Sequence, residues 1–316
     1  MHAATVCKAT ALAAPILAIA LWASLATAKS PSVVVSLPPL QSLVASVMGD
    51  IASPHLILRG GRSPHDATLK PSDLRRLRGA SLIVWVGPTL ETFLAKPIAA
   101  VKKQTTLITL LDLPSLKRLS RRTSGSWELH DHDHEAPRGL SDAVIDPHMW
   151  LSPANAAAIA RSVATVLKKQ DPANVRRYER NTQDLITRIN ALDRRLRISL
   201  KPVSNTPYLV FHDAYQYLEQ HFSLKALGAI SINPERRPGA RRITEIRKQI
   251  KNSGVRCVFR EPQFPPRLVT TITKGTKARI GLLDPLGASL QPGPDQWFNL
   301  MSGLEKALLA CLGDRP

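Results

Sequence analysis

The chain has 316 residues, of which 43 are lysine or arginine and 24 are aspartate or glutamate, so its formal net charge is +19. A chain this basic suggests nucleic acid as a partner, but its arginines are spread out, aromatic residues make up only 5%, and the N-terminal pattern described next predicts export. We therefore expect no nucleic-acid partner, and we interpret the charge as solvated surface that favours an anionic membrane face or an acidic partner.

The N-terminus has the features of a cleavable signal peptide. Lys8 precedes an apolar run at residues 11–26, and residues 26–28 (ATA) supply the small-x-small pattern that signal peptidase recognises. The run is shorter than the roughly 20 residues that a membrane span needs, so an anchored helix is the weaker interpretation. We expect cleavage after Ala28 and a protein that works in the periplasm.

Cleavage there leaves two cysteines, Cys257 and Cys311. An even pair in an oxidising compartment predicts a disulfide, and the alternative is two buried free thiols. The bridge would tie the C-terminus to a predicted strand and contribute about 4 kcal/mol on the chain-entropy model.

The N-terminal half of the mature chain alternates apolar runs with amphipathic stretches. The apolar runs predict buried strands at residues 33–37, 55–60 and 81–88. Helical spacing predicts helices at residues 40–50, 70–80 and 91–103. We expect Gly49 to end the first helix, and Ser72 or Asp73 to cap the second. Strands alternating with helices predict an α/β lobe with a parallel sheet.

A polar segment at residues 115–146 interrupts this alternation, and its glycine, proline and polar content predicts an exposed, mobile loop. Within it, His130, His132 and His134 alternate with aspartates. This spacing lets two or three imidazoles meet one ion, which predicts a second, weaker metal site. The alternative is a loop that is only solvated.

Residues 174–200 have the pattern of one long amphipathic helix, with apolar residues at three- and four-residue steps and arginines on the other face. At about 1.5 Å per residue, it would span one lobe or bridge two. Beyond it the alternation resumes, with strands expected at residues 208–211, 256–259 and 279–283 and helices at 214–222 and 266–276. The expected organisation is a signal peptide at 1–28, a first lobe at 29–172, a linking helix at 173–202 and a second lobe at 203–316.

Four metal-binding side chains lie beside these predicted elements. His65 follows a strand of the first lobe, and His148 precedes a helix at the mouth of the same lobe. His212 and Asp284 stand at the carboxyl ends of strands in the second lobe. Ligands gather outside these ends in open α/β sheets, so two lobes facing each other would bring the four together. Three imidazoles and a carboxylate suit Zn²⁺, although a single histidine in a loop is usually only a solvated or hydrogen-bonded side chain.

Several longer stretches resemble one known family. They are GRSPHDATLKPSDLRRL, LIVWVGPTLETFLAKP, DPHMWLSP, YLVFHDAYQYLEQHF, INPERRPGARRITEIRKQI, CVFREPQF and GLLDPLG. Together they resemble the zinc-specific substrate-binding proteins of bacterial ABC importers, the ZnuA family, over nearly the whole mature chain. The resemblance implies two α/β lobes joined by a long rigid helix, with zinc bound in the cleft between them.

The resemblance also implies partners. The protein would pass zinc to a membrane permease that works with a cytoplasmic ATPase, and it would be a binding protein rather than an enzyme. We expect it to be a monomer. Cys257 and Cys311 match a pair that forms a disulfide in some members.

Residue by residue, His65, His148 and His212 match the three histidine ligands of the family. Some members have a glutamate directly before the first histidine, where this chain has Pro64, which cannot bind a metal. Other members use the aspartate of the DPLG stretch. Asp284 is therefore the candidate fourth ligand, and a water molecule is its competitor.

Other functions fit parts of the sequence. A manganese-specific substrate-binding protein would need more oxygen ligands, so a third histidine at position 212 favours zinc. A zinc hydrolase would need a general base, for which Glu261 is the candidate, but a charge pair between Glu261 and Arg260 is the simpler role. A passive metal buffer or an adhesin would have the same site, and the sequence does not separate it from a transport protein.

Overall fold

The computed structural model describes residues 30–314, apart from positions 60, 124, 128–144, 233 and 235–237. The expected signal peptide and the histidines at positions 130, 132 and 134 lie outside the described residues. Within the described part, no helix has both the length and the apolar composition that crossing a membrane requires.

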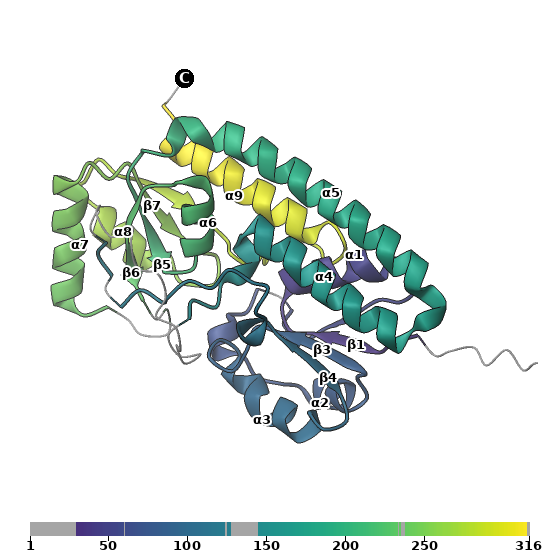
Figure 1. Cartoon of the computed structure of the whole chain (residues 1–316). Helices are drawn as coiled ribbons and strands as arrows, with labels where there is room; N and C mark the ends of the chain where they lie inside the picture. The colour runs from purple at the N-terminus through teal and green to yellow at the C-terminus, as the bar shows by residue number, and fades with distance from the viewer. Residues whose placement is uncertain are drawn as a thin grey trace, which may run out of the picture.

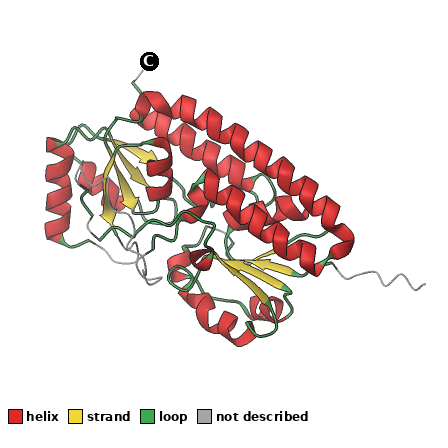
Figure 2. Ribbon diagram, in the orientation of Figure 1, coloured by secondary structure: helices red, strands yellow, loops and turns green. Residues whose placement is uncertain are grey.

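The elements form two α/β lobes and a layer of helices that serves both of them (Figures 1 and 2). The first lobe contains β1 (Val33–Val35), β2 (His55–Leu56), η1 (Pro64–Asp66), α2 (Pro71–Arg78), β3 (Leu82–Trp85), α3 (Thr92–Val101), β4 (Thr106–Thr109) and η2 (Leu110–Asp112). The second lobe contains β5 (Tyr208–His212), α6 (Gln216–Phe222), β6 (Ala226–Ser231), α7 (Ala240–Asn252), β7 (Cys257–Arg260), α8 (Arg267–Thr273) and β8 (Arg279–Leu282). The shared layer contains α1 (Pro38–Met48), α4 (Pro153–Gln170), α5 (Val175–Leu200) and α9 (Gln296–Leu312), with short turns η4 (Met149–Leu151), η5 (Pro172–Asn174) and η6 (Lys201–Val203).

Both sheets are parallel and have the same strand order. The first runs β2-β1-β3-β4 and the second runs β6-β5-β7-β8, so in each the first strand along the chain lies between the second and the third. The order therefore reverses beside β1 and beside β5, and crevices that bind ligands form at such points, outside the carboxyl ends of the strands. The predicted fold class, two α/β lobes with parallel sheets and a long helix, is confirmed.

One hydrophobic core joins the two lobes. Its buried residues come from one face of each sheet and from α1, α4, α5 and α9. Helix α5 buries Leu185, Ile189, Leu192 and Leu196 along one face, as its sequence pattern predicts. Its 26 residues span about 39 Å at about 1.5 Å each, long enough to lie against both lobes (Figure 1).

The C-terminal helix α9 returns the chain to the first lobe. It packs against α1 and α5, and the Trp297 backbone N–H donates to the Ser42 hydroxyl of α1 at 3.0 Å. At its other end, Cys311 forms a disulfide with Cys257 of β7, as predicted. The expected lobe limits at residues 172, 202 and 203 stay predictions. Both lobes contribute to the same core, so no position in the chain divides the core into two parts.

The other face of each sheet has its own, smaller core. In the first lobe α2 and α3 cover residues such as Ile83 and Trp85, and in the second α7 and α8 cover residues such as Leu209 and Val258. Each sheet is therefore a middle layer between outer helices and the shared helices. In Figure 1, α2 and α3 lie at the bottom of the molecule, on the side of the first sheet away from α5.

Several local expectations need correction. Strands β4 and β6 and helices α7 and α9 were not predicted, and β2 has two residues rather than six. Helix α2 begins after Lys70, so neither Ser72 nor Asp73 is the N-cap; instead the Asp73 carboxylate reaches back and accepts from the Lys70 backbone N–H at 3.2 Å. Gly49 does end α1, with a φ of 57° that favours glycine.

The described ends of the polar segment at 115–146 are attached to the protein, contrary to the expected exposed loop. Ser120 pairs with Ile145 in an antiparallel bridge, and Ser126 pairs with Gly228 of β6 in the second lobe. A side-chain carbon at position 228 would lie 2.3 Å from the Gly125 carbonyl oxygen, so only glycine allows this approach. The segment thus crosses from the first lobe to the second before residue 128.

Candidate metal centre

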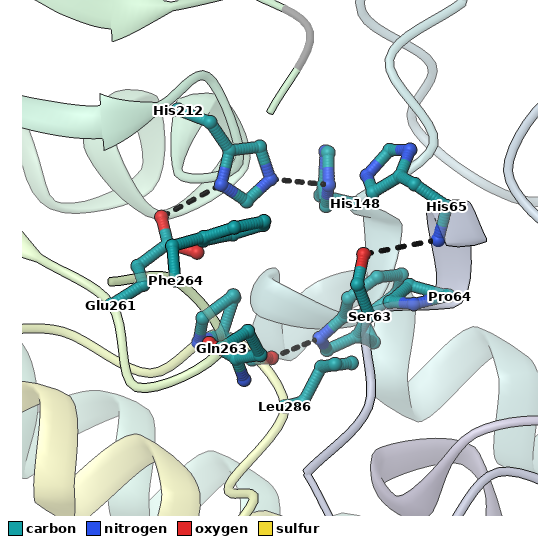
Figure 3. A pocket seen from close by; sticks show the side chains of 11 residues that line it. Ser63, Pro64, His65, His148, His212, Glu261, Gln263, Phe264 and Leu286 are labelled. Atoms are coloured by element: carbon teal, nitrogen blue, oxygen red, sulfur yellow. Dashed lines mark hydrogen bonds and ion pairs between the residues drawn. The ribbon is translucent and has the colours of Figure 1, made fainter. Parts of the chain in front are cut away.

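Three histidines from three separate elements converge between the lobes (Figure 3). His65 lies in η1, where the Ser63 hydroxyl accepts its backbone N–H at 3.2 Å, and His148 precedes η4. His212 is the last residue of β5, at the point where the strand order of the second sheet reverses. One nitrogen from each ring lies within 4.8 Å of the other two, which is close enough for all three to bind one ion.

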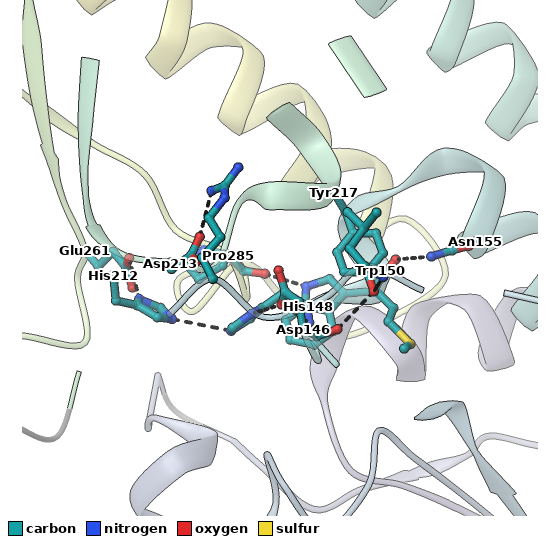
Figure 4. A network of polar contacts seen from close by, with 12 residues as sticks. Asp146, His148, Trp150, Asn155, His212, Asp213, Tyr217, Glu261 and Pro285 are labelled. Carbon is teal, nitrogen blue, oxygen red and sulfur yellow. Dashed lines mark hydrogen bonds and ion pairs between the residues drawn. The ribbon is translucent and has the colours of Figure 1, made fainter. Parts of the chain in front are cut away.

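Two buried carboxylates fix the orientation of two of these rings (Figure 4). The Asp146 Oδ1 atom lies 2.8 Å from the His148 Nδ1 atom, and the Glu261 Oε1 atom lies 2.7 Å from the His212 Nδ1 atom. Each Nδ1–H donates to its carboxylate, which leaves the lone pair on Nε2 for a metal. The two Nε2 atoms are 3.4 Å apart and face each other.

The arrangement of Glu261 follows from the parallel pairing of β5 and β7. Leu209 is in register with Val258, and three residues further along each strand the chain reaches His212 and Glu261. The two side chains therefore emerge side by side from the same face of the sheet. The expected charge pair between Glu261 and Arg260 is absent from the described contacts, because the Glu261 carboxylate binds the histidine instead.

Burial and neighbouring charges set the pKa values of the three rings. Burial, and then the other two histidines, lower the pKa of His65 to about 2, and burial lowers the pKa of His148 well below its ordinary value. Burial also acts to lower the pKa of His212, but the neighbouring Glu261 carboxylate outweighs it and raises that pKa above its ordinary value. His65 and His148 are therefore neutral at physiological pH, as metal ligands must be. In addition, the buried His65 Nε2 atom has no hydrogen-bond partner among the described residues.

The pocket around the rings is small and mostly apolar. Besides the three histidines it is lined by Ser63, Pro64, Trp150, Glu261, Gln263, Phe264, Pro285 and Leu286. It leaves about 10 Å³ of free space, which is room for about one water-sized particle. This space suits a bare ion and excludes an organic substrate of ordinary size.

Asp284 has a different set of partners. Its Oδ1 atom accepts from the Gln263 side chain at 2.9 Å and from the Leu286 backbone N–H at 3.0 Å, while its Oδ2 atom accepts from the Ala288 backbone N–H at 2.6 Å. The described structure does not bring its oxygens into the group of three nitrogens. Its assignment as fourth ligand stays a prediction, and the contacts show which hydrogen bonds it would have to exchange for a metal.

A buried ion-pair network adjoins the three histidines, and sequence reasoning missed it. Arg122, on the segment that crosses between lobes, donates to Asp213 at 2.9 Å and to Glu219 at 2.8 Å, and its guanidinium stacks 3.7 Å from the centre of the Trp127 ring. Asp213 directly follows His212 in the chain. Although burial acts to lower the pKa of Arg122, the two carboxylates raise it, so the guanidinium stays charged.

Asp146 joins this network to the metal centre. Burial raises its pKa to about 6, against the influence of Arg122 and of the His148 backbone N–H that it accepts at 3.0 Å. The Tyr217 hydroxyl donates to the Asp146 carbonyl and accepts from the Leu119 backbone N–H, both at 3.0 Å. The crossing segment thus holds the carboxylate that orients His148. In the sequence, the only local sign of this contact is that Asp146 lies two positions before His148.

Comparisons with known proteins match the chain over most of its length. The family model described as zinc-uptake complex component A, periplasmic, matches residues 33–311. A high-affinity zinc uptake system protein ZnuA of Brucella abortus (strain 2308) is 40% identical, with 89% of this chain and 91% of the relative aligned. The protein of the same name from Yersinia pestis is 37% identical, with 90% and 92% aligned. A solved crystal structure of ZnuA is 25% identical, covers 88% of this chain and 98% of its own, and superposes with a TM-score of 0.72.

Proposed function

Because the chain belongs to the family of periplasmic component A proteins of zinc-uptake complexes, we propose that it captures Zn²⁺ in the periplasm and delivers it to the membrane permease of an ABC importer. The permease works with a cytoplasmic ATPase. The observation that carries the proposal is the convergence of the nitrogens of His65, His148 and His212 in one buried pocket. Like the rest of its family, the protein is a transport component and not an enzyme.

The donor set favours zinc over manganese. Three imidazole nitrogens suit Zn²⁺, whereas Mn²⁺ prefers a site with more oxygen ligands. The two carboxylates that contact the rings, Asp146 and Glu261, each accept from an Nδ1–H of a histidine, so they strengthen nitrogen ligands rather than supply oxygen ligands. Glu261 was the candidate general base of a hydrolase. Because its carboxylate accepts from His212, it is not free for that role, which argues against a hydrolase.

Elemental analysis and titration test the three ligands. Protein purified without added metal should contain zinc, and a competing chelator should measure its affinity. Replacing His65, His148 or His212 by alanine should each weaken zinc binding more than the ~10–100-fold that loss of an outer-shell partner costs. The matched control is His55→Ala, which removes a histidine that contacts Asp73 and does not belong to the group. A histidine whose replacement leaves the dissociation constant unchanged is not a ligand.

For the fourth position we propose Asp284, with a water molecule as the competing ligand. Asp284 would have to release the backbone N–H groups that it now accepts. If it is a ligand, Asp284→Asn weakens zinc binding by at least about tenfold. If it only holds the loop, the variant lowers the unfolding temperature and leaves zinc affinity unchanged, which removes it from the site.

We also propose that His130, His132 and His134 form a second, weaker zinc site that gathers metal near the main one. These residues lie outside the described structure, so the proposal rests on their alternate spacing. Deleting residues 129–135 should lower the zinc stoichiometry at high metal and leave tight binding intact, while His148→Ala should do the reverse. A stoichiometry of one before and after the deletion would contradict the second site.

Processing and oligomeric state are proposed as follows. The signal peptide is cleaved after Ala28, and the mature protein is a monomer. The mass of protein recovered from the periplasm tests the cleavage, since any other N-terminus changes it measurably. Sedimentation of the same sample tests the monomer, and a dimer at micromolar concentration would contradict it.

A further inference from the structure

The outer helices of the first lobe carry a surface of one charge sign. Seven exposed cations lie on α2, on α3 and in the residues that flank them, and together they define the outer basic surface: Lys70, Arg75, Arg76, Arg78, Lys96, Lys102 and Lys103. The two helices pack against each other over the small core of the first sheet. Figure 1 shows them as the outermost layer of this lobe, away from the shared helices.

No exposed acid on these helices offsets the charge. The acid that α2 carries, Asp73, is buried and accepts the Lys70 backbone N–H, while α3 has none. Glu91, directly before α3, is fully buried, accepts from the Val86 and Gly87 backbones, and burial raises its pKa to about 7. Among the described contacts, none of the seven cations forms an ion pair.

On other helices, acidic residues lie among the arginines and pair with some of them. Helix α5 intersperses Glu179, Asp184 and Asp193 among its arginines, and four of these arginines pair with acids. On α7, Glu245 pairs with Arg241 at 3.0 Å. High net charge alone therefore does not explain the outer basic surface, because acids lie among the cations of α5 and α7, whereas α2 and α3 expose none. Uncompensated cations on one face repel one another unless an anionic partner covers them.

The composition of this surface distinguishes between kinds of partner. Protein interfaces bind mainly through buried aromatic and other large apolar side chains. The large hydrophobic residues that the described structure exposes are Ile198, Ile232, Ile280 and Leu282, and none belongs to α2 or α3. Long, flexible cations without an apolar anchor suit a diffuse anionic surface, to which each cation contributes separately.

We propose that the outer basic surface binds the anionic headgroups of phospholipids on the periplasmic face of the membrane. The proposal rests on the periplasmic location in the proposed function, but not on zinc binding. Such binding would keep the protein close to the membrane that contains its permease.

Vesicle co-sedimentation tests this proposal with protein isolated from the periplasm. The vesicles are pure phosphatidylcholine, or phosphatidylcholine with about one third phosphatidylglycerol. Wild-type protein should partition at least about tenfold more strongly to the anionic vesicles at about 0.05 M salt, and about 0.5 M salt should abolish the difference because the contacts are screened. Neutral vesicles that bind equally well, or binding that does not depend on salt, would overturn the proposal.

Two variants with equal charge change locate the surface. The first replaces Arg75, Arg76, Lys102 and Lys103 by glutamine and should lose at least about tenfold in partitioning. The matched control also removes four exposed cations that lack described ion pairs, by replacing the following residues with glutamine: Lys169, Arg176, Arg180 and Arg194. The control should stay within about twofold of wild type, and equal losses in both variants would show that net charge alone acts.

Zinc titration in solution separates this test from the test of the proposed function. The variant lacking the four cations of the outer basic surface should bind zinc with wild-type affinity, since none of the replaced residues lines the pocket. If it binds vesicles like wild type but transfers zinc poorly to the permease, the surface contacts a protein and the lipid proposal is wrong. If wild-type protein binds vesicles but not zinc, the proposed function fails and the lipid proposal stands.

Discussion

Replacing Glu261 by glutamine perturbs the candidate metal centre without replacing any of its three histidines. The Glu261 side chain is 1% exposed, and its Oε1 atom lies 2.7 Å from the His212 Nδ1 atom. Glutamine keeps the shape and can still accept a hydrogen bond from Nδ1–H, but it removes the negative charge. The variant therefore isolates the electrostatic part of the contact between Glu261 and His212.

The expected loss of zinc affinity is about tenfold or more. Removing an outer-shell partner of a metal ligand typically costs ~10–100-fold, which is about 1.4–2.8 kcal/mol at 1.4 kcal/mol per factor of ten. A hydrogen bond to a charged acceptor is roughly twice as strong as one to a neutral acceptor, so glutamine retains part of the interaction. The low end of the range is therefore the better estimate.

The same change should make zinc binding less sensitive to acid. Burial acts to lower the pKa of His212, and Glu261 is the largest cause that raises it. Without the charge of Glu261, His212 takes up its proton only at lower pH and competes less with zinc there. A variant that is merely less stable would show no such shift.

Chelator competition at several pH values between about 5 and 8 measures both effects. The control is Glu305→Gln, which neutralises a buried carboxylate that binds Arg195 on the shared helices. The reasoning is refuted if Glu261→Gln binds zinc within about twofold of wild type at neutral pH, if its acid sensitivity is unchanged, or if Glu305→Gln loses as much affinity.

For the wild type, zinc affinity should fall as the pH is lowered, with about one proton released per zinc ion bound. Burial keeps His65 neutral with a pKa of about 2, whereas the raised pKa of His212 lets a proton compete with zinc there. Isothermal titrations in buffers of different ionisation enthalpy count the released protons, and a count of two or three would contradict this prediction. Replacing Cys257 and Cys311 by alanine should cost about 4 kcal/mol and lower the unfolding temperature by about 10 °C in thermal scans; two titratable thiols in unreduced, denatured protein would refute the bridge. Arg122→Met should lower the unfolding free energy by about 3 kcal/mol in urea titrations, because it leaves the carboxylates of Asp213 and Glu219, which are 4% and 3% exposed, without a cation. A loss below about 1 kcal/mol would show that these carboxylates are already protonated.

The sequence by itself determined the elements whose signals are local. Residues 174–200 show one apolar face at helical spacing, and α5 buries that face. Gly49 ends α1 because the chain there needs a positive φ, which the sequence shows as a glycine after the last apolar residue. The alternation of apolar runs and helical stretches was enough to predict two parallel α/β lobes.

The missed strands have weak signals because their neighbours stabilise them. Strand β4 lies at the edge of its sheet and has one buried residue, Ile108, in four. Strand β6 contains Gly228, which strand propensity disfavours but which the crossing segment requires. In both cases tertiary contacts, rather than the residues of the strand, decide the conformation.

The metal centre divides in the same way. The sequence placed His65, His148 and His212 in loops or at strand ends, where ligands gather in α/β folds. It did not show that Glu261 orients His212, because these residues are 49 positions apart and only the parallel register of β5 and β7 sets them side by side. Nor did it show which hydrogen bonds occupy Asp284. Local spacing fixes which residue types reach an edge, whereas pairing between distant strands fixes which polar groups each of them meets there.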